Sequence, residues 1–358
     1  MKVLMINTVP YVNAGMSVII LNYYKNLKDE VTFDFIVNDF IEQHFFDLID
    51  SEKCKVFILP HRKRKIFSYI KNLRKIAKIE SYDIIHIHGN SSLMAIDQFA
   101  LKNATRAKIL VHCHGSQSDY GIFEKLTRNY FHKNYDKAIT VELEASYLFN
   151  GKEHKVLNNG IDVEKYCFDE SKRRKMRQEL EFENNTVLLH VGRMNTQKNH
   201  KYLIDVFNYY LKKDPNSKLI LIGSGELEKE VLAQVRQLEL SKSISFIGDV
   251  EDTSPWYSIA DVFVFPSTFE PFGLVAVEAQ ANLLPCVFSD RVSEKVKVID
   301  NVTYLPIGKE NINEWVKSIS VFANIRKSQF DQELDDRILQ YDIAYSAKRL
   351  KEIYEQML

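Results

Sequence analysis

Short runs of β-branched and other apolar residues alternate with longer amphipathic segments along the whole chain, and this alternation constrains the fold most. The runs have the length of buried strands, and the segments between them have the length of helices. Strands that alternate with helices form parallel sheets, because a parallel pair needs a long crossover connection. The predicted strands are 3–6, 33–37, 56–59, 84–87, 109–111, 187–191, 219–222, 244–247, 262–265 and 286–288. The predicted helices include 17–27, 66–79, 199–212, 226–239, 274–282 and 311–324.

The length and the grouping of these elements predict two domains. At 358 residues the chain exceeds one ordinary hydrophobic core. The highly charged stretch 160–184 separates the two series of strands, and we expect it to join them as a linker. The sequence therefore predicts an α/β protein with two Rossmann-like domains, 1–165 and 166–340, which face a central cleft where ligands bind.

Composition excludes several other classes of protein. The chain is 45% hydrophobic and 27% charged, which are ordinary values for a globular protein. Its 48 basic and 48 acidic residues cancel, which disfavours a nucleic-acid-binding protein. The four cysteines form no Cys-x-x-Cys pair, and the first residues resemble a strand rather than a signal peptide. Because of the cysteine pattern we expect a reduced, cytoplasmic protein. No apolar run approaches 18 residues, so we expect no transmembrane helix.

The most informative stretch is 263–280, FVFPSTFEPFGLVAVEAQ. A buried strand leads into a loop that carries Glu270 and Gly273, and a helix then begins and carries Glu278. The free amide groups at the start of that helix suit a phosphate or a sugar hydroxyl. Carboxylates in such a place accept hydrogen bonds from sugar or ribose hydroxyls. A surface glutamate beside an ordinary helix cap is the alternative, and for Glu278 alone it is equally plausible.

A second stretch, 190–200, places two cations after a predicted strand. Arg193 follows the strand, and Lys198 opens the next helix. A guanidinium and an ammonium at this place could hold a diphosphate, although an ordinary solvated loop has the same composition. A third stretch, 221–226, has Gly223 and Gly225 in a turn between strand and helix, but it lacks the full dinucleotide-binding fingerprint.

In this order the three stretches resemble the retaining GT-B fold glycosyltransferases of family 4, and the similarity extends over essentially the whole chain. The opening segment resembles the capsular and exopolysaccharide branch of that family, with Ala14-Gly15 where the branch has two glycines. The motifs that carry the resemblance are Glu270 with Glu278, Gly192-Arg193 with Lys198-Asn199, Gly223 with Gly225, Gly248-Asp249-Val250 with Asp261, and Asn159-Gly160-Ile161-Asp162.

The resemblance implies a role for individual residues. It implies that the first domain binds the acceptor and that the second binds the nucleotide sugar. It also implies that the helix expected at 341–358 crosses back to the first domain. It places Arg193 and Lys198 at the donor diphosphate, Glu278 at the ribose, and Glu270 with Phe272, Gly273, Leu274 and Val275 at the donor sugar. It also places Val250 at the nucleobase, Gly15 and Gly223 near the donor, and His114 beside the anomeric carbon.

Four histidines form two His-x-His pairs, His86/His88 and His112/His114, at the ends of first-domain strands. Residues two apart in a strand share a face, so each pair could ligate a metal. A metal-dependent hydrolase is therefore an alternative function. The resemblance favours His114 as the active-site histidine over His112 or a structural role for His114, and we expect His88 to line the cleft or the core.

The expected reaction transfers a sugar from a nucleotide diphosphate sugar to a glycan or lipid-linked acceptor in cell-surface polysaccharide synthesis. The resemblance makes UDP the commonest nucleotide of the donor. The sequence has no Asp-x-Asp to hold a divalent ion. We therefore expect no cofactor and no metal, with Arg193 and Lys198 stabilising the leaving diphosphate. His114, Glu270, Arg193 and Lys198 are the predicted catalytic residues. A non-catalytic subunit that only binds the sugar nucleotide is a further alternative.

Residues 61–79 hold eight Lys or Arg and no acid. A basic amphipathic helix is typical of contact with an anionic membrane, which would suit a lipid-linked acceptor at the inner face of the plasma membrane. The simpler alternative is a helix whose apolar face packs on the sheet while its charges are solvated. The predicted membrane or acceptor residues are Arg62, Lys63, Arg64 and Lys65.

Overall fold

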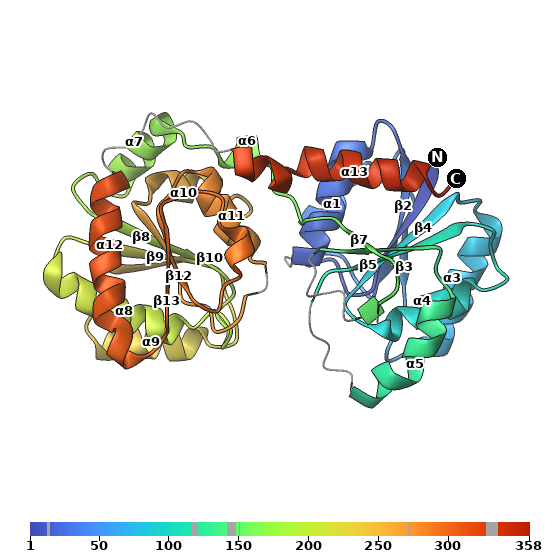
Figure 1. The fold of residues 1–358 in the computed structure, drawn as a ribbon, viewed down its shortest axis with the longest axis horizontal. Helices are drawn as coiled ribbons and strands as arrows, with labels where there is room; N and C mark the ends of the chain where they lie inside the picture. The colour runs from blue at the N-terminus through green and yellow to red at the C-terminus, as the bar shows by residue number, and fades with distance from the viewer. Residues whose placement is uncertain (13–14, 116–120, 142–147, 150, 271, 327–335) are drawn as a thin grey trace. The chain divides into compact units, whose positions relative to one another are not determined.

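A computed structural model describes residues 1–12, 15–115, 121–141, 148–149, 151–270, 272–326 and 336–358. The chain divides into two compact units (Figure 1). Unit 1 comprises 1–160 with 340–358, and unit 2 comprises 161–339. Among the described residues, no helix has the length and the apolar character that crossing a membrane requires.

Unit 1 is built on a parallel sheet of seven strands in the order β3-β2-β1-β4-β5-β6-β7. The strands are β1 (Lys2–Asn7), β2 (Thr32–Asn38), β3 (Val56–Leu59), β4 (Ile84–Gly89), β5 (Lys108–Cys113), β6 (Lys137–Thr140) and β7 (Lys155–Val156). The helices are α1 (Gly15–Leu27), α2 (Gln43–Asp47), α3 (Ile66–Ile79), α4 (Ala95–Leu101), α5 (Gly121–Lys133) and α13 (Ile343–Glu355), with a 3₁₀ turn η1 (Ser92–Met94).

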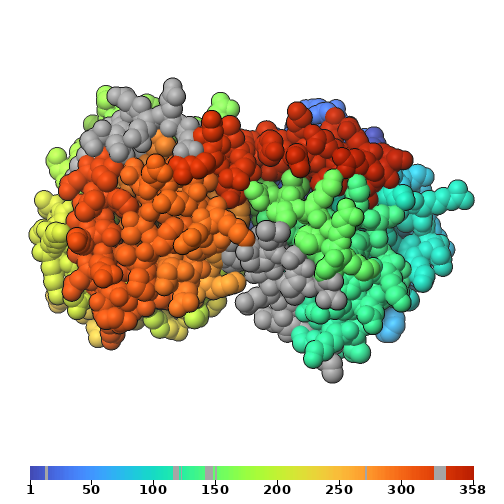
Figure 2. Space-filling model, viewed as in Figure 1, coloured from blue at the N-terminus to red at the C-terminus, as the bar shows by residue number. Residues whose placement is uncertain are grey.

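Helices cover both faces of this sheet. Apolar residues of α3, α4 and α5 pack with those of the strands in one buried cluster. Right-handed crossovers place these three helices on the same face, because the chain moves in one direction along the sheet from β3 to β6. Helix α13 packs against α1 and lies on the outside of unit 1, where it is red in Figures 1 and 2.

Unit 2 has a parallel sheet of six strands in the order β10-β9-β8-β11-β12-β13. The strands are β8 (Val187–Val191), β9 (Lys218–Ile222), β10 (Ile244–Gly248), β11 (Val262–Phe265), β12 (Cys286–Ser289) and β13 (Val302–Leu305). The helices are α6 (Val163–Tyr166), α7 (Glu170–Glu179), α8 (His200–Lys213), α9 (Glu228–Gln237), α10 (Ser254–Ile259), α11 (Leu274–Ala281) and α12 (Ile312–Arg326). Short 3₁₀ helices are η3 (Glu294–Val296), η4 (Lys309–Asn311) and η5 (Asp336–Tyr341).

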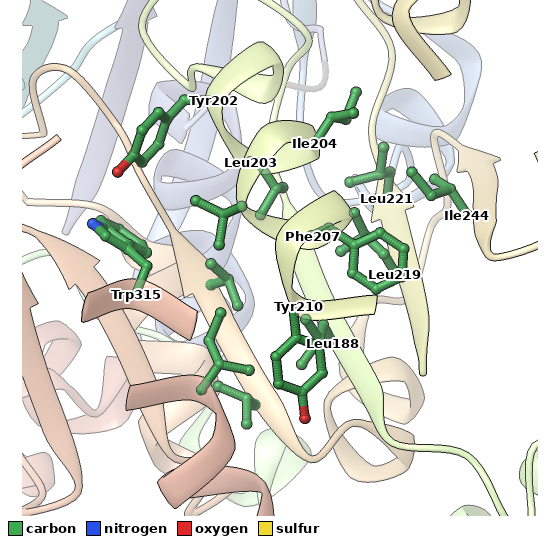
Figure 3. Close-up of a cluster of buried hydrophobic side chains, with 14 of the residues drawn as sticks. Leu188, Tyr202, Leu203, Ile204, Phe207, Tyr210, Leu219, Leu221, Ile244 and Trp315 are labelled. Carbon is green, nitrogen blue, oxygen red and sulfur yellow. The ribbon is translucent and has the colours of Figure 1, made fainter. Parts of the chain in front are cut away.

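One hydrophobic core of unit 2 lies between its sheet and helices α8, α9 and α12 (Figure 3). Phe207 and Leu203 of α8 pack with Leu188 and Leu219 of the central strands. The rings of Tyr202 and Trp315 meet edge to face with their centres 5.7 Å apart, which ties α12 to α8. This packing fixes the start of α8, and therefore the loop before it.

Both sheets have the same strand order, and each reverses direction once. The first three strands of a unit run towards one edge, and the fourth returns to pair with the first, as β4 does with β1 and β11 with β8. At this reversal, right-handed crossovers lead the chain from the two neighbouring strands towards opposite faces of the sheet. Ligands of doubly wound folds bind at this point.

The predicted elements and the structure differ in several places. The strands β6, β7 and β13 and the helices α2, α4, α5, α6, α7 and α10 were not predicted. The stretch 160–184 is not a linker, because its residues from Ile161 onwards belong to unit 2, and the boundary lies between Gly160 and Ile161 rather than after residue 165. Gly160 permits this crossing, because a Cβ there would lie 2.6 Å from Cα of Ile343 in α13.

Two arginines of this charged stretch are buried, which explains why it folds into unit 2. Arg173 and Arg177 of α7 both pair with Asp261, at 2.5 and 3.2 Å. The same carboxylate accepts a hydrogen bond from the backbone N of Val187 at 2.8 Å. Asp261 thereby ties α7 and β8 to the start of β11.

We predict that Asp261→Asn destabilises the protein by about 3–5 kcal/mol, because it leaves two buried guanidinium groups without a carboxylate. Urea unfolding followed by circular dichroism measures this change. Glu170→Gln is the control, because Glu170 pairs with Arg174 on the surface and its loss is expected to cost at most about 0.5 kcal/mol. Equal stability of the Asp261→Asn and Glu170→Gln variants would contradict the role of Asp261 as the buried partner of Arg173 and Arg177.

Candidate functional site

The reversal point of the second sheet brings together two residues that are far apart in the sequence. Strand β8 leads into the loop that carries Lys198, and the neighbouring strand β11 leads into the loop that carries Glu270. Lys198 Nζ contacts Glu270 Oε2, and the two side chains are only 15% and 9% exposed. The backbone N of Thr268 donates to the carbonyl of Gln197 at 2.8 Å, which joins the two loops.

Neighbouring residues hold the Lys198 side chain in place and leave donor capacity on its ammonium group for a ligand. Its Nζ lies 4.5 Å from the centre of the Phe265 ring, and its backbone N donates to Asn195 Oδ1 at 3.0 Å. Gln197 Nε2 donates to the carbonyl of Phe269 at 2.8 Å and lies 3.4 Å from Glu270 Oε2. An ammonium group has three donors, so Lys198 can serve an anionic ligand as well as Glu270.

Glycines allow the loops after β8 and β9 to approach each other by their backbones. Gly223 has a φ of +120°, and a Cβ there would lie 2.4 Å from the carbonyl oxygen of Gly192. A Cβ at Gly225 would likewise lie 2.4 Å from the carbonyl oxygen of Met194. The Gly-x-Gly turn therefore has a packing reason within unit 2.

Arg193, the other predicted cation, has a different environment from Lys198. Its side chain is 72% exposed, and Nε lies 3.2 Å from Oε2 of Glu226, which is also exposed. The two cations of the predicted diphosphate site therefore differ in burial: Lys198 is mostly buried, whereas Arg193 lies at the surface.

Helix α11 begins directly beside the Lys198–Glu270 pair. Gly273 precedes it in the left-handed conformation, with a φ of +61°, and a Cβ there would lie 2.8 Å from Cγ of Glu270. The first hydrogen bond of the turn runs from Ala276 N to the Gly273 carbonyl at 2.8 Å, so the amides of Leu274 and Val275 precede it. Phe272 is buried at this start, whereas Pro271 lies outside the described residues.

Glu278, one turn further along α11, is held by a buried tyrosine that the sequence analysis missed. Tyr257 Oη of α10 donates to Glu278 Oε2 at 2.7 Å. The Tyr166 ring meets the Tyr257 ring edge to face with their centres 5.7 Å apart. Loss of hydration raises the pKa of Glu278, whereas hydrogen bonds from both tyrosines lower it. Glu278 is therefore not an ordinary surface glutamate.

The loop after β10 completes this edge of unit 2. The Gly223 N–H donates to the carbonyl of Gly248 at 2.8 Å, and the Ser224 N–H donates to Asp249 Oδ1 at 3.1 Å. Val250 follows and is half-buried. The loops after β8, β9 and β10 are thus joined by backbone contacts.

In unit 1 the four predicted histidines lie in one cluster at the ends of β4 and β5. His88 and His112 are neighbours in register, so both His-x-His pairs face the same side of the sheet. His88 Nδ1 and His114 Nε2 share a hydrogen bond of 2.8 Å. His86 Nδ1 shares one of 2.7 Å with Oη of Tyr354, on α13.

His86, His88 and His112 are fully buried, and their surroundings favour neutral rings. Burial lowers the pKa of all four histidines, that of His114 to about 3. One ring nitrogen from each of His86, His88 and His112 lies within 4.8 Å of the others, a spacing that could hold a metal. The rings of His86 and His112 are parallel within 1° with their centres 5.3 Å apart, as in a packed aromatic cluster.

The structure changes the interpretation of two further predicted positions. Gly15 opens α1, and nothing lies within 4 Å of a Cβ built there, so packing does not require a glycine. Arg62 is buried and pairs with Asp97 at 2.6 Å, so its assignment to membrane or acceptor contact is wrong. Its guanidinium satisfies a buried carboxylate, whereas Lys63, Arg64 and Lys65 are exposed.

Family models match both units. The model "Glycosyltransferase Family 4" matches residues 14–165, and the model "Glycosyl transferases group 1" matches residues 171–337. Together they account for most of the chain. The chain belongs to the GT-B glycosyltransferases. This membership favours sugar transfer over the hydrolase alternative.

Individual proteins support the same assignment over two thirds or more of the chain. EpsF of Bacillus subtilis, which carries a glycosyltransferase name, is 25% identical over 95% of this chain and 93% of its own. An Escherichia coli UDP-Gal:alpha-D-GlcNAc-diphosphoundecaprenol alpha-1,3-galactosyltransferase is 27% identical over 68% of each chain. The crystal structure of HepE from Anabaena in complex with UDP has the same fold, with a TM-score of 0.78 and 20% identity over 99% of this chain and 100% of its own.

Sequence reasoning missed the residues that orient this glycosyltransferase's candidate groups. Tyr257 and Tyr166 lie on short helices far from Glu278 in the sequence, and neither belongs to a motif. Tyr354 contacts the histidine cluster from the C-terminal helix. Gln197, beside Lys198, and Tyr354, in the helix expected at 341–358, lay within stretches already singled out. No local pattern marks the tyrosines, because tertiary packing brings them to their partners.

The neutral histidine cluster predicts that the glycosyltransferase loses stability as the pH falls. Below about pH 6.5 the unfolded chain binds protons that the buried rings do not bind. Each fully buried ring should therefore cost about 1.4 kcal/mol per pH unit, until the pH reaches its lowered pKa in the folded state. Urea unfolding between about pH 7.5 and about pH 5.5 measures how the free energy of unfolding depends on pH. His112→Phe should reduce the slope of that dependence by the contribution of one buried ring. Identical slopes for the wild type and His112→Phe would contradict a neutral His112.

Proposed function

We propose that this glycosyltransferase moves a sugar from a UDP-sugar, with retention of anomeric configuration, to a glycan or lipid-linked acceptor in cell-surface polysaccharide synthesis. The observation that carries the proposal is the Lys198–Glu270 pair beside the start of α11, at the reversal point of a doubly wound sheet. HepE has been crystallised with UDP and with UDP-glucose, and the E. coli relative is named for a UDP-galactose donor and a lipid-diphosphate acceptor. These names support the proposed substrates.

In this proposal the donor diphosphate lies at Lys198 and the first amides of α11. Sugar transfer leaves negative charge on the diphosphate, and a buried ammonium stabilises that charge more strongly than an exposed one does. Arg193 adds a second cation by exchanging its exposed partner Glu226 for a phosphate oxygen. An exposed ion pair of this kind is weak, so the exchange costs little.

The remaining donor contacts follow from the same placement. Glu270 and the amides from Phe272 to Val275 bind the sugar hydroxyls. Glu278 accepts hydrogen bonds from the ribose hydroxyls, while Tyr257 donates a hydrogen bond to Oε2 of the same carboxylate. The backbone of Val250 lies at the nucleobase, and Gly223 lets the chain approach the donor closely. In unit 1, Gly15 opens a helix whose first amides suit a phosphate.

Retention follows from attack on the same face from which the diphosphate leaves. The bond between the anomeric carbon and the phosphate oxygen breaks, and its electron pair stays on the diphosphate. The acceptor hydroxyl bonds to the anomeric carbon, and its proton passes to a donor phosphate oxygen. His114, which is neutral, contributes a hydrogen bond at the sugar rather than a charge.

The central test replaces the buried ammonium. Lys198→Met should lower kcat/KM with a UDP-sugar about 100- to 1,000-fold, the scale for removing one preorganised donor. Lys201→Met is the matched control, because Lys201 lies one turn away with an exposed partner, Glu230. Product formation from radiolabelled donor measures turnover, and circular dichroism confirms the fold. Normal turnover in Lys198→Met would overturn the proposed donor site.

We also propose that the transfer step needs no divalent ion, because Lys198, Arg193 and the α11 amides supply the positive charge. EDTA should therefore leave the initial rate of sugar transfer unchanged within a factor of about two. A buffer control without EDTA and a repeat with added Mg²⁺ or Mn²⁺ complete the measurement. Loss of turnover in EDTA that a divalent ion restores would contradict this part of the proposal.

A further inference from the structure

The carboxylate of Glu278 is held by tyrosine hydroxyls from two other helices of unit 2. Helices α6, α10 and α11 pack against one another and bring these groups together (Figure 1). Tyr257 Oη, on α10, donates to Glu278 Oε2 at 2.7 Å. Tyr166, on α6, hydrogen-bonds to the same carboxylate, and its hydroxyl also lies 3.3 Å from Thr253 Oγ1. Neither hydroxyl takes part in the sugar-transfer step proposed above.

Packing within unit 2 fixes the position of Tyr257. Its side chain is fully buried, and its ring meets the rings of Tyr166 and of Phe263 in β11, with centres 5.7 and 5.8 Å away. Asn282, at the end of α11, donates to Ser258 Oγ at 3.1 Å and to the carbonyl of Tyr166 at 2.9 Å. These bonds tie α10 and α6 to α11. The Tyr257 hydroxyl is therefore held in place by the protein itself, before a nucleotide binds.

The hydroxyl of Tyr257 acts as a hydrogen-bond donor towards Glu278. Burial raises the pKa of Tyr257 well above its usual value, so the hydroxyl keeps its proton. Its other acceptor, the carbonyl oxygen of Val275, lies at 3.5 Å, much further away than Glu278 Oε2 at 2.7 Å. Loss of hydration raises the pKa of Glu278, and the hydrogen bond from Tyr257 is the largest of the effects that lower it. Tyr257 therefore favours the ionised carboxylate, the form that accepts hydrogen bonds from hydroxyl groups.

The carboxylate of Glu278 keeps capacity for a ligand while Tyr257 is bound to it. An ionised carboxylate has about four lone-pair sites on its two oxygens, and Tyr257 uses one of them, on Oε2. The neighbouring 2′ and 3′ hydroxyls of a ribose are two donors at a fixed spacing, so both reach one carboxylate only when it has the right orientation. A hydrogen bond from a rigidly packed phenol keeps that orientation before binding. A 2′-deoxyribose supplies only one of these donors and leaves an acceptor of the half-buried Glu278 without a partner.

We propose that Tyr257 is a positioning residue for donor binding, which orients Glu278 towards both ribose hydroxyls and thereby makes the site select ribonucleotides over 2′-deoxyribonucleotides. Tyr166 assists through the second tyrosine hydroxyl on the same carboxylate. A site built to hydrogen-bond a hydroxyl group discriminates against the analogue that lacks it, because a polar group of the site is then left unpaired. The inference rests on the proposed function, which places the ribose at Glu278.

Isothermal titration calorimetry of the full-length protein with UDP and with 2′-deoxy-UDP tests the inference, and it needs neither turnover nor an acceptor. We expect the wild type to bind UDP about 10- to 100-fold more tightly than 2′-deoxy-UDP, the scale for one hydrogen bond to a charged group. Tyr257→Phe keeps the ring and removes the hydroxyl, and it should lower this ratio about tenfold, mainly by weakening the binding of UDP. Tyr166→Phe should lower the ratio about threefold. The matched control is Tyr210→Phe, in the core of unit 2 near the end of α8, which should leave the ratio unchanged (Figure 3).

Glu278→Gln distinguishes failure of this inference from failure of the proposed function. If Glu278→Gln keeps the wild-type ratio, or the wild type shows no preference for UDP, the ribose does not lie at Glu278, and both the donor site and this inference are overturned. If Glu278→Gln loses the preference while Tyr257→Phe and Tyr166→Phe keep it, only the positioning role is overturned. Equal weakening of UDP and 2′-deoxy-UDP by Tyr257→Phe also overturns that role, because an unchanged ratio indicates a purely structural tyrosine. Circular dichroism confirms the folding of each variant.

Discussion

The reversal of strand order in each sheet is the constraint on which the rest of the structure depends. Parallel strands need right-handed crossovers, and in each sheet the chain adds three strands towards one edge before the fourth strand pairs with the first. At that return the loops after β8 and β11 lie side by side, and Lys198 contacts Glu270, which is 72 residues further along the sequence. The loops after β9 and β10 reach the same edge through contacts between glycines. The candidate donor site is therefore a consequence of topology.

Buried ionic groups occur in several places, and their partners distinguish structure from function. Asp261 is satisfied by two arginines and a backbone amide, and Asp97 by Arg62 and the hydroxyl of Tyr69 at 2.6 Å. Such saturated groups anchor elements and have no capacity left for a ligand. Lys198 and Glu278 are each held by a defined partner yet keep donors or acceptors that are not committed. That difference, rather than burial itself, marks them as candidates for substrate contact.

Unit 1 separates its chemistry between two surfaces of one sheet. The histidine cluster lies with Tyr354 of α13, and its buried, neutral rings leave His114 as a hydrogen-bonding group rather than a cation. The opposite face is covered by α3, α4 and α5, whose outer sides carry exposed lysines and aromatic residues.

The sequence alone determined the two doubly wound domains, most of the central strands, and the candidate residues from Lys198 to Glu278. These features depend on hydrophobic periodicity and on local motifs, both of which are encoded over short stretches. Only the tertiary structure decided that 161–184 belongs to unit 2, that Arg62 is a core residue, and that Tyr257 holds Glu278. A charged residue has the same local signature whether it is solvated or paired in the interior. Its partner comes from a distant segment, so packing alone reveals which of the two it is.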